Sequence, residues 1–421
     1  MKNIKKDLNL ELNNPIGFFD LKEEDLFEIA VRKNLKRNFL FVSKLIGKHI
    51  PMKAHSLFYT GALLAEKFAN ETYRDSIYEE KDCIDMVKAI KTNTRLLEDK
   101  ISPKLNKENV LIIGFAETAT GLGFSFYKNF ANSYYVHTTR ENCEEELLFG
   151  FEEEHSHATG HRCYFKNKEL LSKIDRIILV DDEFTTGNTC LNLINEMNNL
   201  YPGKKYTLVS ILDWRNKTSK RNFEEYAQKN NVEINVVSLF SGEIDYKHEI
   251  RTFNDTTDFN NYSTLTKGYL DIHMNLDPLS YNGNIEVQNN VFAKIDIVAK
   301  DIIETIKPSL LFGNTLILGF EENIYLPSIV SDKLDCNFAS ITLSPIYPNT
   351  DFEDKYPIQN AFRFQNAEKN LFLYNLTSDY QNVVIIVDKK LDENAKNNIS
   401  GYLNEKHNVK KVIFVNIERK M

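Results

Sequence analysis

One stretch of this sequence, residues 176–189, constrains the fold more than any other. It starts with the apolar run Arg176–Val180, continues with Asp181 and Asp182, and ends in the turn Thr185–Thr189. A short run rich in Ile and Val is typical of a strand in a parallel sheet that is buried on both faces. The stretch therefore predicts a strand, an acidic pair and a tight turn that opens a helix, at the sheet edge where α/β folds bind ligands.

Similar apolar runs recur along the chain and alternate with segments of helix length. This alternation predicts an α/β architecture with mostly parallel sheets flanked by helices. The runs of a first block are Val110–Ile113, Ser133–Val136 and Tyr206–Leu212, and those of a second block are Thr315–Leu318, Asn337–Thr342, Leu371–Tyr374, Val383–Val387 and Val412–Val415.

These patterns divide the 421 residues into four expected parts. We expect residues 1–105 to be mostly helical, residues 106–245 to form a first α/β domain, residues 246–290 to be a polar connector, and residues 291–421 to form a second α/β domain. A chain of this length has room for two or three domains.

The composition excludes several classes of protein. The formal net charge of −8 provides no general attraction to nucleic acid or to an anionic membrane. The apolar runs are too short for a membrane helix, and the first residues lack the apolar stretch of a secretory signal. The five cysteines are scattered, so we expect neither a disulfide framework nor a Cys-type zinc site. We expect a cytoplasmic location, where cysteines stay reduced.

The turn after the acidic pair has the chemistry of a phosphate cradle. Backbone N–H groups and hydroxyls at a helix N-terminus bind a phosphate dianion, and the candidates here are Thr185, Thr186, Gly187, Asn188 and Thr189. The carboxylates of Asp181 and Asp182 can accept hydrogen bonds from vicinal sugar hydroxyls or hold Mg²⁺ through water. A phosphate beside a diol describes ribose 5-phosphate. The alternative is an ordinary strand, turn and helix with Asp and Thr as capping residues.

This segment resembles the phosphoribosyl pyrophosphate (PRPP) signature of the type I phosphoribosyltransferases, and all signature positions match. The resemblance implies a type I phosphoribosyltransferase-like parallel sheet flanked by helices, with a second α/β domain after it. It also implies an enzyme that uses Mg²⁺ and moves ribose 5-phosphate from PRPP to a base-like acceptor, with release of pyrophosphate. Asp181 and Asp182 would then hold the ribose and stabilise positive charge at C1′, and residues 1–105 would include the hood that recognises the acceptor.

The family's pyrophosphate loop follows its first core strand. The matching residues here are Ala116, Glu117, Thr118, Ala119 and Thr120. Several family members have a non-proline cis peptide and a basic residue in this loop, whereas this chain has Glu117 and no Lys or Arg. A carboxylate repels a diphosphate, so we expect either that Mg²⁺ lies between them or that Glu117 contacts something else, such as the acceptor.

The next strand ends at Arg140, where orotate-type relatives carry a basic residue that opens a mobile loop. Arg140 is our candidate for neutralising the leaving group, and a surface salt bridge with Glu144 or Glu145 is the alternative. The loop itself contains His155 and His157, which would contact substrate when it closes. A transition-metal site and a solvated polar loop are the other interpretations of these histidines.

Two further residues are candidates for acceptor recognition. Trp214 follows a sheet strand and would either stack on a base-like acceptor or pack at the rim. Lys44 precedes two more basic residues, Lys48 and His49, beside the strand-like run Phe39–Val42. This basic group would supply the acceptor hood or a homodimer contact, or would be a solvated charged face.

A closer resemblance covers nearly the whole chain. It is to the phosphoribosyltransferase-like proteins of bacterial tellurite-resistance and stress gene clusters, with their C-terminal TRSP domain, although the motif that names this domain has Arg where this chain has Leu343. The resemblance implies synthesis of a nucleoside-like metabolite, with partner proteins from the same gene cluster. A PRPP-binding regulator without turnover is the alternative. The matching segments are Arg37–Lys44, Glu117–Gly123, His137–Glu141, Glu153–Thr159, Val180–Glu183, Gly319–Glu322, Thr342–Pro345 and Tyr374–Leu376.

The two halves also resemble each other. Gly114 and Gly319 both end an apolar run (319 − 114 = 205), and Val180 and Val387 do so as well (387 − 180 = 207). Near-constant offsets predict a duplication, and different strand orders in the two sheets would contradict it. The second half has Lys389–Leu391 in place of the Thr/Gly turn, so we expect it not to bind PRPP. Coincidence between two generic α/β domains is the alternative.

Overall fold

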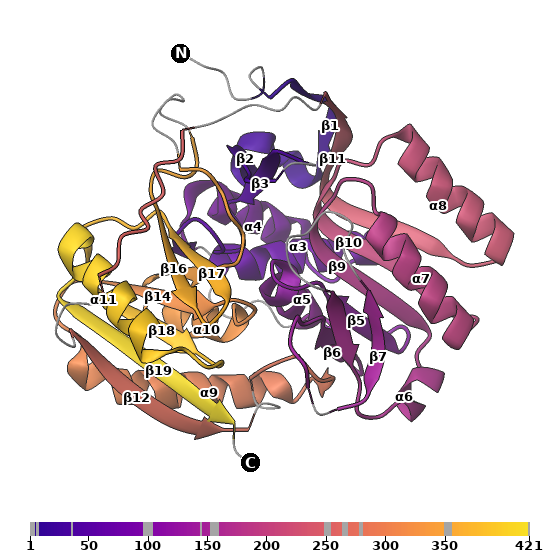
Figure 1. The fold of residues 1–421 in the computed structure, drawn as a ribbon. Coiled ribbons are helices and arrows are strands. Elements are labelled where there is room, and N and C mark those ends of the chain that lie inside the picture. Colours follow the sequence, from indigo (N-terminus) through magenta and orange to yellow (C-terminus); the bar gives the residue numbers. More distant parts are fainter. Residues whose placement is uncertain are drawn as a thin grey trace.

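The structure is a computed structural model in which two α/β halves lie side by side (Figure 1). Two helices, α3 (His55–Tyr73) and α5 (Ala119–Tyr127), lie between the two sheets. Across the described part of the chain, no helix is long and apolar enough to cross a bilayer. The described residues are 5, 8–34, 37–95, 104–143, 145–151, 160–247, 254–262, 268–277, 281–348 and 356–419.

The first sheet contains the predicted strand that ends at the acidic pair. Its order, within the described residues, is β1-β11-β10-β9-β5-β6-β13. The chain enters at β5, passes to β6 on one side and then to β9 on the other, so the carboxyl ends of β5 and β9 flank a switch point where such sheets bind ligands. The five parallel strands are β5 (Val110–Gly114), β6 (Tyr134–His137), β9 (Arg176–Phe184), β10 (Lys205–Asp213) and β11 (Ile234–Tyr246).

Helices cover both faces of this sheet, which is why its strands are apolar throughout. In β9, Ile177 and Leu179 belong to a cluster with residues of α7 (Asn188–Leu200) and α8 (Lys217–Asn230). The alternate residues Ile178 and Val180 belong to the cluster that contains α3 and α5. The helix pair α7 and α8 therefore packs on one face and α3 and α5 on the other (Figure 1).

The N-terminal region differs from the expectation of a mostly helical stretch. Helices α3 and α4 (Glu80–Thr92) are present, but before residue 54 more of the described residues lie in strands than in helices, and the helices α2 (Glu23–Leu26) and η1 (Phe18–Asp20) are short. The hairpin of β2 (Phe27–Val31) and β3 (Phe39–Ser43) follows from short apolar runs rich in Phe, Ile and Val. At the edge of the first sheet, β1 (Leu10–Gly17) pairs antiparallel with β11.

The second sheet has the order β12-β19-β18-β14-β15-β4 among the described strands. Its strands β14, β15, β18, β19 and β12 are parallel, and β4 is antiparallel to β15. The strands are β4 (Met52–Lys53), β12 (Tyr269–Leu276), β14 (Asn314–Phe320), β15 (Asn337–Ile341), β18 (Tyr380–Val387) and β19 (Lys411–Arg419), and the helices are α9 (Val291–Ile306), α10 (Tyr325–Lys333) and α11 (Glu393–His407).

Four strands of each sheet share one order, as the predicted duplication requires. The sequence β10-β9-β5-β6 in the first sheet matches β19-β18-β14-β15 in the second. A hairpin follows β6 in one half and β15 in the other. These hairpins are β7 (Leu147–Phe151) with β8 (His161–Tyr164), and β16 (Ala361–Asn366) with β17 (Lys369–Tyr374). The fifth strands differ, because β11 follows β10 in the chain whereas β12 precedes β14.

Each sheet is completed by a strand from the other half. The strand β4, from the N-terminal region, pairs with β15 of the second sheet. Conversely, β13 (Val287–Gln288) pairs with β6 of the first sheet. The segment 246–290, expected to be a connector, therefore provides edge strands to both sheets through β12 and β13.

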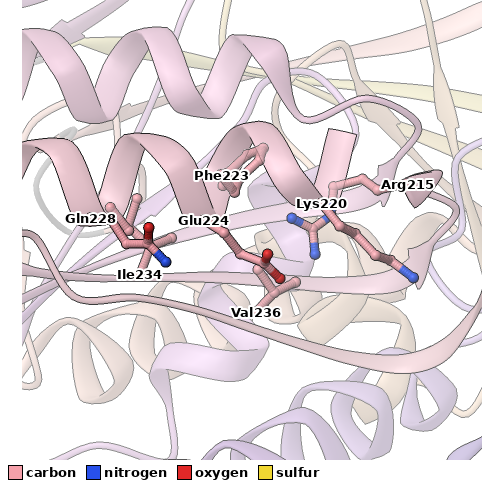
Figure 2. Close-up of a pocket in the computed structure, with 8 residues that line it drawn as sticks. Arg215, Lys220, Phe223, Glu224, Gln228, Ile234 and Val236 are labelled. Atoms are coloured by element: carbon pink, nitrogen blue, oxygen red, sulfur yellow. The ribbon is translucent and has the colours of Figure 1, made fainter. Parts of the chain in front are cut away.

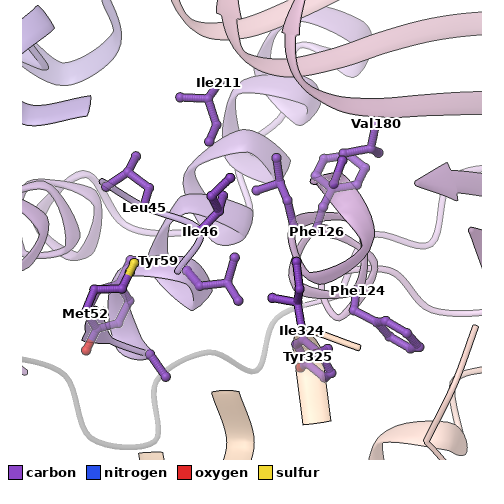
Figure 3. Close-up of a cluster of buried hydrophobic side chains, with 14 of the residues drawn as sticks. Leu45, Ile46, Met52, Tyr59, Phe124, Phe126, Val180, Ile211, Ile324 and Tyr325 are labelled. Atoms are coloured by element: carbon purple, nitrogen blue, oxygen red, sulfur yellow. The ribbon is translucent and has the colours of Figure 1, made fainter. Parts of the chain in front are cut away.

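Both halves contribute to one apolar core. Ile324 and Tyr325 of the second half lie beside Phe124 and Phe126 of α5 (Figure 3). The rings of Phe124 and Tyr325 stack with centroids 4.9 Å apart. A Cβ on Gly121 would lie 2.6 Å from Ile324, so this glycine permits the close approach of the two halves.

Candidate active site

The predicted strand, turn and helix are present at the end of β9. The strand extends through Asp181 and Asp182, and α7 begins at Asn188 after a turn. Gly187 in this turn has a φ of 74°, the left-handed region that glycine adopts without steric cost. The side chains of Thr186 and Asn188 are exposed, and Thr186 Oγ1 accepts a hydrogen bond of 3.3 Å from the Asn188 amide. The turn thus presents hydroxyls and amides to solvent at a helix N-terminus.

The acidic residues at the end of β9 lie among basic side chains. The Asp182 amide donates to Asp181 Oδ1 at 2.9 Å. Burial raises the pKa of Asp182, and the Lys48 ammonium opposes this rise. Burial also raises the pKa of Glu183, which forms an ion pair of 2.7 Å with Arg37 from the segment before β3. These carboxylates are therefore partly desolvated and are balanced by cations from the N-terminal region.

The loop after β5 has the cis peptide that the family resemblance implies, between Ala116 and Glu117. The Ala116 amide donates to Thr138 Oγ1 at 2.8 Å. Two of the predicted pyrophosphate-loop residues, Ala119 and Thr120, begin α5. The strand order brings this loop next to the acidic pair, because β5 and β9 are neighbours.

Glu117, the unexpected carboxylate in this loop, is buried and contacts two polar side chains. Its Oε2 accepts a hydrogen bond of 2.9 Å from Thr342 Oγ1, and Lys48 Nζ lies 3.4 Å from the same oxygen. Its Oε1 is buried with no hydrogen-bond partner among the described residues. Thr342 belongs to the second half of the chain, so that half contacts the candidate pyrophosphate loop directly.

A reciprocal contact links the first half to the second. Glu322 occupies in the second half the place of Glu117 in the first (322 − 117 = 205). Its Oε2 accepts a hydrogen bond of 2.8 Å from Thr139 Oγ1, as Glu117 accepts one from Thr342. The two halves therefore pair like the subunits of a symmetric dimer, each inserting a threonine hydroxyl toward a glutamate of the other.

Arg140 is held through its backbone. Its amide donates to Glu322 Oε1 at 3.0 Å, and its carbonyl accepts from Arg162 at 3.2 Å. Its Nε is buried without a hydrogen-bond partner among the described residues. The structure thus fixes the start of the loop that Arg140 opens, while its role at the leaving group remains a prediction.

The predicted lid histidines His155 and His157 lie outside the described residues. A third histidine of that loop, His161, is buried at the start of β8. Its Nδ1 lies 2.9 Å from Thr138 Oγ1, the same hydroxyl that accepts from the Ala116 amide. His161 is therefore linked to the candidate pyrophosphate loop through the hydroxyl of Thr138. The spacing of residues in the sequence did not reveal this link.

Trp214 is a core residue, which corrects its assignment as an acceptor contact. Its side chain is fully buried and stacks on Phe41 of the β2–β3 hairpin with centroids 5.4 Å apart. Phe27 and Phe240 pack against its other sides. Lys44, the other candidate for the acceptor, forms an ion pair of 2.6 Å with Glu28.

Residues 26–243, which carry the hairpin, the acidic pair and both loops, match the family described as phosphoribosyl transferase. The chain belongs to this family. It is therefore a phosphoribosyltransferase, as the sequence resemblance predicts. Residues 284–403 match the TRSP domain, described as lying C-terminal to that transferase domain, which confirms the predicted pairing of the two.

Solved structures similar to this phosphoribosyltransferase include adenine phosphoribosyltransferases. That of Trypanosoma brucei, in complex with AMP, pyrophosphate and ribose-5-phosphate, is 10% identical, with 51% of this chain and 76% of the other covered and a TM-score of 0.30. The Leishmania donovani enzyme is 13% identical with the same coverage and TM-score, and that of Thermoanaerobacter pseudethanolicus is 13% identical, with 51% and 95% covered and a TM-score of 0.27. No curated protein matches the chain.

In the TRSP half, the place that corresponds to the acidic pair of the transferase half is occupied by a cluster of ion pairs. Lys389, which aligns with Asp182, lies 3.2 Å from Glu141, 3.2 Å from Glu321 and 3.3 Å from Glu322. This ammonium and the hydrogen bonds from Arg140 and Thr139 lower the pKa of Glu322 to about 2 despite its burial. A site already closed by ion pairs fits the expectation that this half does not bind PRPP.

A groove of about 390 Å³ lies between α8 and β11, near the predicted phosphate turn but outside it. Figure 2 shows Arg215, Lys220 and Phe223 among its lining residues. Arg215 forms a two-pronged contact with Asp213, with distances of 2.8 and 2.9 Å. The groove includes neither the acidic pair nor the loop after β5, so we do not assign the substrate to it.

Proposed function

We propose that this phosphoribosyltransferase moves ribose 5-phosphate from PRPP to a base-like acceptor and releases pyrophosphate. The observation that carries the proposal is the acidic pair at the end of β9, followed directly by an exposed Thr/Gly turn at the start of α7. Phosphate binds a helix N-terminus, and carboxylates accept hydrogen bonds from the neighbouring ribose hydroxyls.

In the proposed reaction the C1′–O bond of PRPP breaks and its electron pair leaves on the diphosphate. The acceptor nitrogen forms the new C1′–N bond and releases its proton to solvent. Fixing the ribose phosphate and neutralising the developing charges are the main tasks of the protein. Thr185–Thr189 would hold the 5-phosphate, Asp181 and Asp182 the ribose hydroxyls, and residues 116–120 with Arg140 the pyrophosphate.

We include Mg²⁺ in the proposal. Asp181 and Asp182 would hold it through water, and when bound it would reduce the negative charge of the diphosphate. Among the described residues, no group of three or more His, Cys, Asp or Glu side chains is placed to hold a metal ion. Two carboxylates still fit Mg²⁺, because this ion keeps several waters and takes its other ligands from substrate phosphates.

A PRPP-binding regulator without turnover is the alternative. The lack of a Lys or Arg in the loop after β5 would favour it, but Lys48 from the N-terminal region lies 3.4 Å from Glu117 and provides a cation there. Release of pyrophosphate from PRPP and Mg²⁺ with a panel of bases would distinguish the two. The resemblance to proteins of stress gene clusters supports a nucleoside-like product, with His155 and His157 as candidates for acceptor contact.

Calorimetry with PRPP tests the proposal. The Asp181→Asn/Thr186→Val variant removes one carboxylate charge and one hydroxyl while it preserves shape. We expect PRPP affinity to fall at least a hundredfold, because charge-assisted hydrogen bonds are worth about 1.5–3 kcal/mol each.

The matched control makes the same chemical changes in the second half. Thr377 and Asp379 are exposed in the turn before β18, where Thr377 Oγ1 donates a hydrogen bond of 3.2 Å to Asp379 Oδ2. The Asp379→Asn/Thr377→Val variant should bind PRPP as the wild type does. Equal PRPP affinity in the wild type and in the Asp181→Asn/Thr186→Val variant would refute the proposed site.

A further inference from the structure

Lys48 is a lysine buried between the two halves of the molecule. Lysine is almost never buried without a charged partner, yet only 6% of Lys48 is exposed. Its neighbour Gly47 has a φ of 65°, and a Cβ there would lie 2.3 Å from the ring of Phe338 in the second half. The backbone that carries Lys48 is therefore pressed against the TRSP half, and the ammonium is held in one place.

The ammonium points at the loop after β5. Lys48 Nζ donates to Thr118 Oγ1 at 2.7 Å and lies 3.4 Å from Glu117 Oε2. The second distance is long for a charged hydrogen bond, which is usually about 2.7–2.9 Å. An ammonium has three donors, so the hydroxyl of Thr118 and the distant carboxylate do not saturate it. Lys48 thus keeps hydrogen-bonding capacity at the candidate pyrophosphate loop.

Glu117 is stabilised in a way that does not depend on Lys48 alone. The hydroxyl of Thr342 donates to the same oxygen, Oε2, at 2.9 Å. A carboxylate with a second donor remains stable when Lys48 turns toward an anion. Thr342 comes from the TRSP half, which would then contribute to the transferase site by holding this carboxylate.

Lys48 also acts on the acidic pair. Its charge opposes the rise in the pKa of Asp182 that burial causes. The pairing of β5 with β9 also brings the loop that Lys48 contacts next to the proposed ribose site. A diphosphate leaving C1′ would occupy the space between these two places. No Lys or Arg is present in the segment Gly114–Gly121 itself. A cation from elsewhere in the chain is therefore needed to neutralise the charge that develops there.

We propose that Lys48 is a second cation, besides Arg140, that binds the diphosphate of PRPP, in place of the basic residue that the loop after β5 lacks. This inference rests on the proposed function, because it assumes that PRPP occupies the site. Thr118 and Glu117 hold the Lys48 ammonium at the loop, and when PRPP binds, the ammonium donates to the diphosphate oxygens. The electron pair of the breaking C1′–O bond then moves onto an oxygen that faces a fixed positive charge.

Calorimetric titration with three ligands tests this assignment. We expect Lys48→Met to weaken the binding of pyrophosphate and of PRPP at least tenfold and to leave that of ribose 5-phosphate within twofold of wild type. Lys48→Arg should restore part of the pyrophosphate affinity because it restores the charge. Lys53→Met is the matched control, since Lys53 pairs with Asp335 at 2.8 Å, away from the loop, and its loss should change none of the three affinities.

A second variant separates binding from folding. Lys48→Met leaves Glu117 without its counter-ion and can reduce stability, whereas Lys48→Met/Glu117→Gln removes both charges and should melt near the wild-type temperature. This double variant should still bind pyrophosphate at least tenfold more weakly than Glu117→Gln alone. If the wild type binds PRPP and the folded Lys48 variants bind it and pyrophosphate equally well, the assignment of Lys48 is wrong while the proposed function stands. A wild type that binds neither ligand would overturn the proposed function, and this assignment with it.

Discussion

At the residue scale, the phosphate turn depends on Gly187 for two separate reasons. Its φ of 74° is strained for any residue with a Cβ, and a Cβ there would lie 2.8 Å from the ring of Phe223. We expect Gly187→Ala to lower the free energy of unfolding by roughly 1–3 kcal/mol and to weaken ribose 5-phosphate binding, because the turn must shift. Urea unfolding and calorimetry measure the two effects.

Gly203 offers a control that isolates the backbone cost. It has a φ of 81°, and a Cβ there would meet no atom within 4 Å. Gly203→Ala should therefore cost only about 1 kcal/mol of stability and leave ligand binding unchanged. Equal effects of the two substitutions on ribose 5-phosphate binding would contradict a phosphate site at the turn.

Asp388, which follows β18 in the TRSP half, should make the free energy of unfolding depend on pH. Burial raises its pKa to about 7, against a usual value near 3.9, although Lys389 is close and opposes the shift. Between about pH 4 and pH 7 the folded chain holds a proton that the unfolded chain has lost, so stability falls as pH rises through this range. Asp388→Asn cannot ionise and should melt like the wild type at pH 4 but at a higher temperature at pH 8. The gain is at most roughly 4 kcal/mol, and equal melting temperatures at pH 8 would contradict it.

The residues that sequence reasoning placed correctly are neighbours in the chain. The strand, acidic pair and turn of residues 176–189 follow from local patterns, since a buried strand and a glycine turn each have their own signature. The partners of Glu117 do not follow from local patterns, because Lys48 lies 69 positions before it and Thr342 lies 225 positions after it in the sequence (117 − 48 = 69; 342 − 117 = 225). A contact of that kind depends on how whole elements pack, and a single sequence carries no direct signal for it.

At the element scale, the loop after β15 reaches the loop after β5 of the other half. The contact is the hydrogen bond from Thr342 to Glu117, both of which are buried. Thr342→Val keeps the side-chain shape but leaves a buried carboxylate without this donor. We expect a loss of about 1–3 kcal/mol in stability and a several-fold weaker binding of pyrophosphate, measured by urea unfolding and calorimetry.

An exposed threonine provides the comparison for Thr342. Thr305 of α9 donates only to a backbone carbonyl of its own helix, Asp301 O, at 2.7 Å. Thr305→Val should change stability by less than about 0.5 kcal/mol and leave pyrophosphate binding intact. Unchanged pyrophosphate affinity in Thr342→Val would show that the TRSP half does not influence the site through this bond.

The sequence predicts helices and strands correctly where a segment is long enough to show a hydrophobic pattern, and it does not where the segment is only two residues long. Helix α3 follows from its apolar stripe, and the parallel strands follow from continuous apolar runs. The strands β4 and β13 are two residues long each, so no pattern marks them. They form because the opposite half presents an unpaired sheet edge, and the same cause explains why the expected connector contains edge strands.

At the scale of the whole molecule, the two halves of the chain have similar arrangements, as the predicted duplication requires. The equal strand order, the exchanged edge strands and the reciprocal Glu–Thr bonds all relate one half to the other. Only the transferase half retains the Thr/Gly turn, while the TRSP half closes the equivalent place with Lys389. The second half thus contacts the first as one subunit of a symmetric dimer contacts the other, and the association of two such chains stays a prediction.

This internal pairing predicts that neither half folds alone. Separation would expose Tyr325 and Phe338, both of which are buried, and would remove β4 from one sheet and β13 from the other. Each large apolar side chain exposed costs about 1.5–3 kcal/mol, so exposure of about five of them is comparable to the 5–15 kcal/mol that stabilises a typical domain. We expect residues 1–250 and 251–421, expressed separately, to give no cooperative melting, and co-expression to restore it together with PRPP binding. The intact chain should melt in one transition, because one apolar core contains residues of both halves. A C-terminal fragment that melts cooperatively by itself would contradict this prediction, because it would show that the shared core adds little to the stability of the second half.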